Sequence, residues 1–184
     1  MDLLEAASAQ LERIVASVCP PCWGNLTPCG ITVREVVDHV VAGNIFAARL
    51  LAGASAATAT ADLGGDQLGD DPRSAVVSSC DRQLAAFAAA DRAQALHHPS
   101  GDISFETFVR FRLGELVVHA WDVAVGSGLD SSLDESVVDG LWALVAPHVD
   151  EMRGMGTFGD GASNDLPVEA SPQTRLLDAF GRRG

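Results

Sequence analysis

Apolar residues recur every three or four positions along most of this chain, which is the spacing of one face of an α-helix. The pattern predicts helices over residues 2–18, 32–51, 72–90, 105–126 and 134–152, and a short closing helix over 171–180. Thr32 and Glu35 have the spacing of a capping box, which favours a helix start at Thr32. No segment outside short loops shows the alternation typical of a strand.

These helices predict an all-α fold in one domain over residues 1–184. Four main helices with shorter ones imply a four-helix bundle with long crossover loops and short extra helices. The small, acidic, glycine-bearing segment 54–71 is interpreted as a crossover loop. Residues 93–102 form a second connection, in which His97 and His98 are expected to be an exposed or hinge pair.

The helix over 105–126 is apolar on most sides and is therefore predicted to be buried. Arg112, Glu115, His119 and Asp122 nevertheless follow one stripe along it. Burying a carboxylate or an imidazole without a partner costs about 2 kcal/mol or more. Because Glu115 and His119 are four residues apart, their side chains lie side by side. These two side chains are expected either to bond to each other or to bind the same metal ion.

His39, at the edge of the apolar stripe of the second helix, is the best third ligand for such an ion. Two imidazoles and one carboxylate suit Zn²⁺, Ni²⁺ and other divalent transition metals, and a three-ligand set leaves a position open for water or substrate. Glu35 is a weaker ligand candidate, because the capping box already uses it. From the residues alone, a buried hydrogen-bonded network fits as well as a metal site.

Composition excludes several classes of partner. The chain has 12 arginines and no lysine against 25 acidic residues, and its net charge is −13. This charge argues against nucleic acid and anionic membranes as partners. No apolar run reaches the roughly 18 residues of a membrane span, and the N-terminal stretch does not resemble a secretory signal. A cytoplasmic protein is expected.

Four cysteines are present, and free thiols are expected for all of them in a cytosolic chain. Cys19-Pro-Pro-Cys22 has the C-x-x-C spacing of a redox pair or half a zinc site, but it lacks the neighbouring sequence that either requires. We interpret this pair as two small buried residues beside a turn. Residues 154–159 match G-x-G-x-x-G, but they follow a helix, so no dinucleotide site is expected.

Three stretches together resemble a known family: Thr27-Pro-Cys29, Thr32 to Asn44 with His39 inside it, and Phe111 to Ala124 with Glu115-x-x-x-His119 followed by Trp121-Asp122. They are similar to the metal-binding domain of mycothiol-dependent maleylpyruvate isomerases, within the DinB-like superfamily. Gly30-Ile31 stand where related sequences often carry Trp. The isomerase has a further C-terminal domain that this chain does not include.

The resemblance implies an up-down-down-up four-helix bundle with a divalent metal, most simply zinc, held by His39, Glu115 and His119. It also implies a homodimer and mycothiol as a cosubstrate. Asp122 is expected to orient a ligand imidazole. Arg112 is expected to pair with Glu115 or with a substrate carboxylate, and Asn44 to line the cofactor pocket.

The leading hypothesis is therefore a metal-dependent S-transferase or isomerase that joins a small thiol to an electrophilic substrate. A non-enzymatic metal-binding or ligand-sensing module is the alternative. Hydrolysis of an ester or amide by a metal-bound water is a third possibility.

Overall fold

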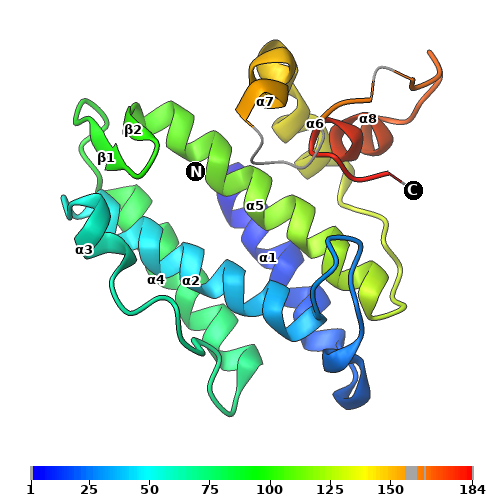
Figure 1. Ribbon diagram of the computed structural model, residues 1–184, viewed down its shortest axis with the longest axis horizontal. Helices are drawn as coiled ribbons and strands as arrows, with labels where there is room; N and C mark the ends of the chain where they lie inside the picture. The colour runs from blue at the N-terminus through cyan, green and yellow to red at the C-terminus, as the bar shows by residue number, and fades with distance from the viewer. Residues whose placement is uncertain (1, 156–160, 164, 184) are drawn as a thin grey trace.

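The computed structural model describes residues 2–155, 161–163 and 165–183, and most of them are helical. Four long helices dominate Figure 1: α1 (Asp2–Ser17), α2 (Val33–Leu51), α4 (Pro72–Ala89) and α5 (Phe105–Gly126). The bounds of α5 are those predicted, and the other three differ from prediction by one residue at one end. Local periodicity and capping residues therefore define these elements well.

The four long helices pack around one core, in which α1 contacts α4 and α5, and α2 also contacts α4 and α5. The side chain of Val33, at the start of α2, lies against Gly126 at the end of α5, so these helices are antiparallel. Just beyond the ends of α1 and α5, Cys22 lies 3.7 Å from the Ser127 carbonyl oxygen, so α1 and α5 run the same way. Arg73, at the start of α4, donates to the Val18 carbonyl beyond the end of α1. Helix α4 therefore runs opposite to α1.

Shorter elements complete the described chain. They are η1 (Pro20–Gly24), α3 (Ala56–Thr60), β1 (Leu96–His98), β2 (Gly101–Ile103), α6 (Glu135–Val145), η2 (Ala146–His148), α7 (Val149–Met155) and α8 (Pro172–Ala179). Helices α6 and α8 pack on each other beside α5 (Figure 1). The motif at 154–159 lies largely outside the described residues.

Three sequence predictions are wrong in detail. Helix α3 forms inside the segment predicted as a loop, where Ser55 caps it by accepting a hydrogen bond from the Thr58 backbone N–H. The predicted connection over residues 93–102 instead forms most of an antiparallel hairpin that ends at Ile103, which lies opposite Leu96. The predicted helix 134–152 is divided at Pro147, because proline has no N–H to continue the α-helical hydrogen bonds.

The capping box of α2 is present: the Thr32 side chain accepts from the Glu35 backbone N–H, and the Glu35 carboxylate accepts from the Thr32 N–H at 2.8 Å. This use holds Glu35 at the helix end. At α5, Ser104 caps the helix by accepting from the Thr107 N–H. Helix α5 is buried on most of its circumference, as predicted.

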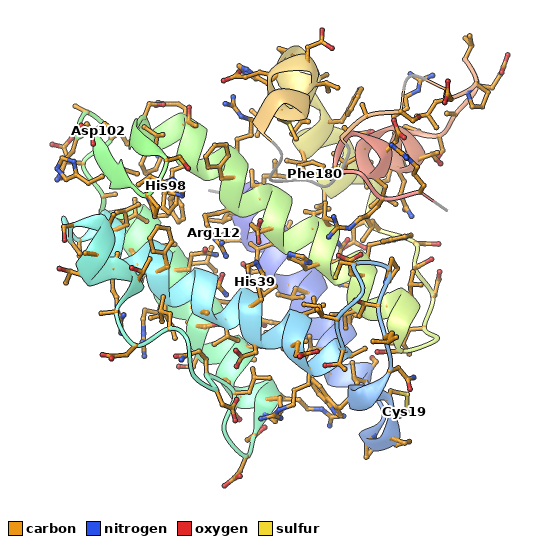
Figure 2. The ribbon with its side chains drawn as sticks, viewed as in Figure 1. Cys19, His39, His98, Asp102, Arg112 and Phe180 are labelled. Atoms are coloured by element: carbon orange, nitrogen blue, oxygen red, sulfur yellow. A yellow bond between two sulfur atoms is a disulfide. The ribbon has the colours of Figure 1, made fainter. Side chains whose placement is uncertain are left out.

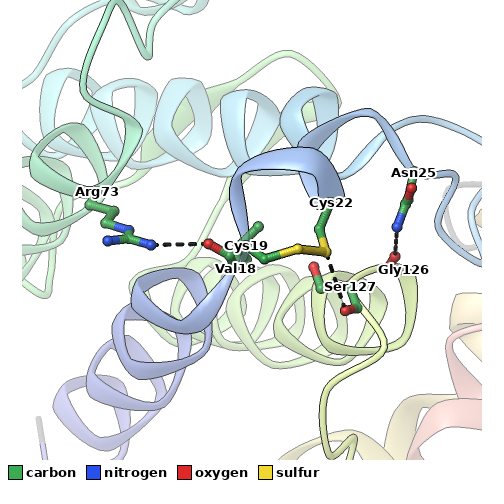
Figure 3. Close-up of a disulfide and its surroundings, with 7 residues drawn as sticks. All are labelled: Val18, Cys19, Cys22, Asn25, Arg73, Gly126 and Ser127. Atoms are coloured by element: carbon green, nitrogen blue, oxygen red, sulfur yellow. Dashed lines mark hydrogen bonds between the residues drawn. A yellow bond between two sulfur atoms is a disulfide. The ribbon is translucent and has the colours of Figure 1, made fainter.

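The prediction of free thiols is wrong for one pair of cysteines. Cys19 and Cys22 form a disulfide with Cα atoms 5.2 Å apart, because the intervening prolines form a tight 3-10 turn (Figure 3). Cys19 is exposed rather than buried. Cys29 and Cys80 are free thiols, as predicted.

Among the described residues, no helix is long and apolar enough to cross a membrane.

Candidate metal centre

Three side chains from two helices meet between α2 and α5. His39 Nε2 lies 2.8 Å from Glu115 Oε2, and His119 Nε2 lies 3.4 Å from the same oxygen. The three ligand atoms lie within 4.8 Å of one another. The structure therefore brings together the histidine of α2 and the Glu-x-x-x-His pair of α5, although 76 residues separate His39 from Glu115.

The geometry of these donors suits a divalent transition metal. Two ligands that each lie about 2.0–2.1 Å from a tetrahedral zinc ion are about 3.4 Å from each other. The distance between Glu115 and His119 already has this value, at 3.4 Å. His39, at 2.8 Å from Glu115, must retreat by a few tenths of an ångström to admit a cation. Its side chain is more than half exposed, so it has room to move.

A second layer of contacts orients His119. Its Nδ1 lies 3.0 Å from Asp122 Oδ2, one turn further along α5. Asp122 is fully buried and in turn accepts hydrogen bonds from Arg182, the shortest at 2.8 Å. A carboxylate that holds one ring nitrogen of a histidine leaves the other free to bind a metal. Here Asp122 holds Nδ1, and Nε2 faces Glu115 and His39.

These contacts also set the ionisation of the site. Burial disfavours a charged Glu115, but hydrogen bonds from His119 and His39 and the positive charges of His119 and Arg112 outweigh it, so the pKa of Glu115 lies well below its usual value. Burial likewise disfavours a charged His119. Hydrogen bonds to Asp122, Cys29 and Glu115 outweigh that effect and raise the pKa of His119 well above its usual value. A cation at the site would therefore have to displace a proton.

Cys29 lies on the other side of the His119 ring, where Cys29, His119 and Asp122 also come within 4.8 Å of one another. Burial raises the pKa of the Cys29 thiol, but hydrogen bonds with His119 and Thr27 outweigh it and lower the pKa. Arg182 already neutralises Asp122 and would repel a cation placed there. The His39, Glu115 and His119 group is therefore the better metal site.

Two of the cavities have both His39 and Glu115 in their walls. The larger, of about 450 Å³, includes His39 and Glu115 in its wall and extends along α2 and α5 toward the β1–β2 hairpin. The smaller, of about 290 Å³, is bounded by Cys29, His119 and Arg182 as well as by His39 and Glu115. The donor atoms therefore lie between a larger, mainly apolar space and a smaller, more polar one.

The remaining predicted site residues lie further along the same seam between α2 and α5. Arg112 is buried in the wall of the larger cavity and bonds to Gln83 and Asn44, not to Glu115. Asn44 is fully buried behind Arg112, where it also donates to Ser79, so it supports the wall from behind.

Sequence reasoning missed two residues of the site. His98, expected to be an exposed or hinge residue, is half buried and lines the larger cavity. Arg182 returns from the C-terminal segment to Asp122, 60 residues away. The unpaired Asp122 on an apolar helix was a signal that some cation must reach it, but nothing in the sequence identified which one.

Comparison with known proteins gives the family. The sequence profile of the mycothiol maleylpyruvate isomerase N-terminal domain matches residues 4–124, a range that contains all three donors. The chain belongs to this family.

Two proteins of Mycobacterium tuberculosis, from strains CDC 1551 and H37Rv, are each 30% identical to the chain over 189 residues. Each match covers 99% of this chain and 98% of the relative, and both relatives are described as uncharacterized. No solved structure matches the chain. The ring of Phe180 packs against Gly114 of α5, and Arg182 bonds to Asp122. Both residues lie beyond the matched range, so the family assignment does not account for these contacts.

Proposed function

We propose that this chain binds a divalent transition metal, most simply Zn²⁺, at His39, Glu115 and His119, and promotes the reaction of a small thiol with an electrophilic substrate. Mycothiol is the thiol that membership of the family suggests. The observation that supports this most directly is that the three donor atoms lie within 4.8 Å of one another and that two of them, from His39 and Glu115, belong to the wall of a cavity of about 450 Å³. We also infer a DinB-type bundle, since α1 and α5 run one way and α2 and α4 the other.

The bound metal would supply one property, a lowered pKa for a thiol that reaches it, and so a thiolate at neutral pH. The chain's own residues do the rest. Asp122 holds His119 in the orientation that presents Nε2, and Arg182 holds Asp122. The partly exposed His39 marks the side from which a thiol has access.

The larger cavity gives the electrophile a place beside the thiol. Its wall is mainly apolar, so a bound substrate is separated from bulk water next to the donor atoms. Placing two reactants side by side removes much of the entropic cost of their encounter. This cavity favours a protein that binds a second small molecule, as an enzyme or a ligand sensor does, over one that binds a metal alone.

Metal content tests the first half of the proposal. We expect the purified wild-type protein to contain close to one equivalent of a divalent transition metal, and His39→Ala to retain much less. His97→Ala is the matched control, because His97 is exposed on the hairpin and pairs with Asp102. Equal metal content in His39→Ala and wild type would refute the assignment of the site.

Thiol conjugation tests the second half. Metal-loaded protein is incubated with mycothiol and a panel of electrophiles, and loss of free thiol is followed against a protein-free blank. We expect at least one electrophile to react faster with wild-type protein and not with His39→Ala. Rates equal to the blank for every pair, with metal bound, would exclude the transferase function while leaving the metal site intact.

A further inference from the structure

The larger cavity contains a buried charge that the proposed thiol chemistry does not use. Arg112 is 5% exposed and lines this cavity between His98 and the metal donors (Figure 2). Its Nε donates to Gln83 Oε1 at 2.9 Å, and its Nη2 donates to Asn44 Oδ1 at 2.9 Å. Both partners are neutral amides. The guanidinium charge is therefore held in place by hydrogen bonds, but neither of those bonds neutralises it.

The third nitrogen of this guanidinium differs from the other two. Within the part of the chain that the structure describes, Nη1 of Arg112 donates no hydrogen bond. Gly43 accommodates the guanidinium at this position, since a Cβ there would lie only 2.5 Å from Nη1. Burying a cation without a counter-ion is costly, and the cost is recovered when an anion binds to it.

The nearby acidic residue does not fill this role. Glu115 acts on Arg112 electrostatically, but its Oε2 is bonded to His39 and His119. Glu115 therefore makes no hydrogen bond or close ion pair with Arg112 among the described contacts, and the guanidinium faces the cavity with a positive charge. This arrangement favours a ligand with a negative charge.

The other residues of the cavity wall indicate the chemistry of the rest of the ligand. The wall carries three phenylalanine rings and aliphatic side chains: Phe46, Phe108, Phe111, Leu63 and Ala42. His98 contacts these rings, and its Nδ1 accepts from the Ser100 backbone N–H at 3.2 Å. Burial and the charge of Arg112 lower the pKa of His98, so the ring is neutral with its proton on Nε2. Among the described residues of this wall, Arg112 is the one guanidinium available to a carboxylate.

We propose that this cavity binds a small monocarboxylic acid with an apolar or aromatic body. Its carboxylate pairs with Nη1 of Arg112, and its body lies against the phenylalanine rings. A dicarboxylate fits less well, because its second charge would face either the rings or Glu115. The binding of the acid does not depend on the proposed function. Its role as the electrophile of the thiol reaction does rest on that function.

Binding of 3-phenylpropanoate to the full chain, measured by calorimetry, tests this inference. The neutral control ligand is 3-phenylpropanamide, which has nearly the same shape, and the dicarboxylate control is glutarate. A charge-assisted hydrogen bond in a buried site favours the acid over the amide by about tenfold or more. Equal affinity of acid and amide for wild-type protein would overturn the proposal without any mutation. Glutarate binding as tightly as the acid would overturn its restriction to monocarboxylates.

Two substitutions test whether the acid binds at Arg112. Arg112→Met should remove the preference for the acid, whereas Arg110→Met, on the same helix but outside the cavity wall, should keep it. An acid preference that survives in a folded Arg112→Met protein would refute the role of this residue.

His39→Ala separates this inference from the proposed function, because it removes a metal donor and leaves Arg112 in place. We expect the acid preference to remain in this variant. A wild-type protein that shows the acid preference but conjugates no thiol would count against the proposed function alone. No acid preference in a wild-type protein that conjugates thiols would count against this inference alone.

Discussion

Helix α5 buries two charged side chains ten residues apart, and the protein treats them differently. Asp122 is paired with Arg182 and His119, so its charge is matched by ionic and hydrogen-bonding partners. Arg112 is bonded to two neutral amides and lines a cavity. A buried charge whose partners all belong to the protein serves structure and positioning. One with a free donor facing a cavity marks a place for a ligand.

The largest expected effect on stability comes from Asp122, the charge that is paired. Asp122→Ala leaves Arg182 and His119 without their carboxylate, and removing one member of a buried ion pair costs about 3 kcal/mol or more. We expect a loss of that size in the free energy of unfolding, measured by urea denaturation. Asp139→Ala, at an exposed position on α6, is the control and should stay within about 0.5 kcal/mol of wild type. A similar result for both variants would mean that the Asp122 pairing contributes little.

The next effect concerns how firmly His119 is held in position. Arg182→Gln should weaken metal binding about tenfold, because Asp122 then holds His119 less firmly. Metal affinity is measured by competition with a chelator of known strength. Arg175→Gln, which changes an arginine on α8 that bonds to the Val168 carbonyl, is the matched control. Unchanged affinity in Arg182→Gln would show that the C-terminal segment has no part in the metal site.

For Arg112, which has no ionic partner among the described contacts, the expected loss of stability is smaller. Arg112→Met deprives Gln83 and Asn44 of one hydrogen bond each, but it also removes a buried charge. We expect a net loss of about 1 kcal/mol in the free energy of unfolding, well below that of Asp122→Ala. If the two losses are equal in urea denaturation, the contrast between the paired and unpaired charges is wrong.

The smallest effect is one of pH on the metal-free protein. The raised pKa of His119 contributes stability that is complete below 6.5 and is lost as the pH rises through the folded-state pKa. The lowered pKa of Glu115 contributes stability above 4.5 that is lost as the pH falls. This pair therefore stabilises the metal-free chain most between about pH 4.5 and 6.5.

Thermal melting at pH 6 and pH 9 tests this effect. The melting temperature of the metal-free wild type, taken relative to His119→Gln, should fall by a few degrees between the two pH values. Adding Zn²⁺ should reverse the trend, since metal ligation requires the deprotonated ring. A difference that is constant with pH would contradict the assigned ionisation of His119.

Much of the fold and part of the site were open to prediction. The bounds of α5 and the capping box at Thr32 follow from periodicity and local hydrogen bonding. The Glu115 and His119 pair is also local, because a helix places residues four apart on one face. The disulfide, helix α3 and the hairpin were missed. Each depends on turn geometry in segments whose composition gave no clear period.

The sequence by itself determined where the long helices lie and which polar residues share a stripe of α5. Only the tertiary structure decided what those residues meet: His39 at Glu115, Arg182 at Asp122, and two neutral amides at Arg112. The physical reason is range. Side chains within one turn of a helix are positioned by the backbone between them, whereas partners 29 to 76 residues apart depend on how whole helices dock. Among the residues that the structure describes, that docking left one guanidinium nitrogen of Arg112 without a hydrogen-bond partner beside the cavity.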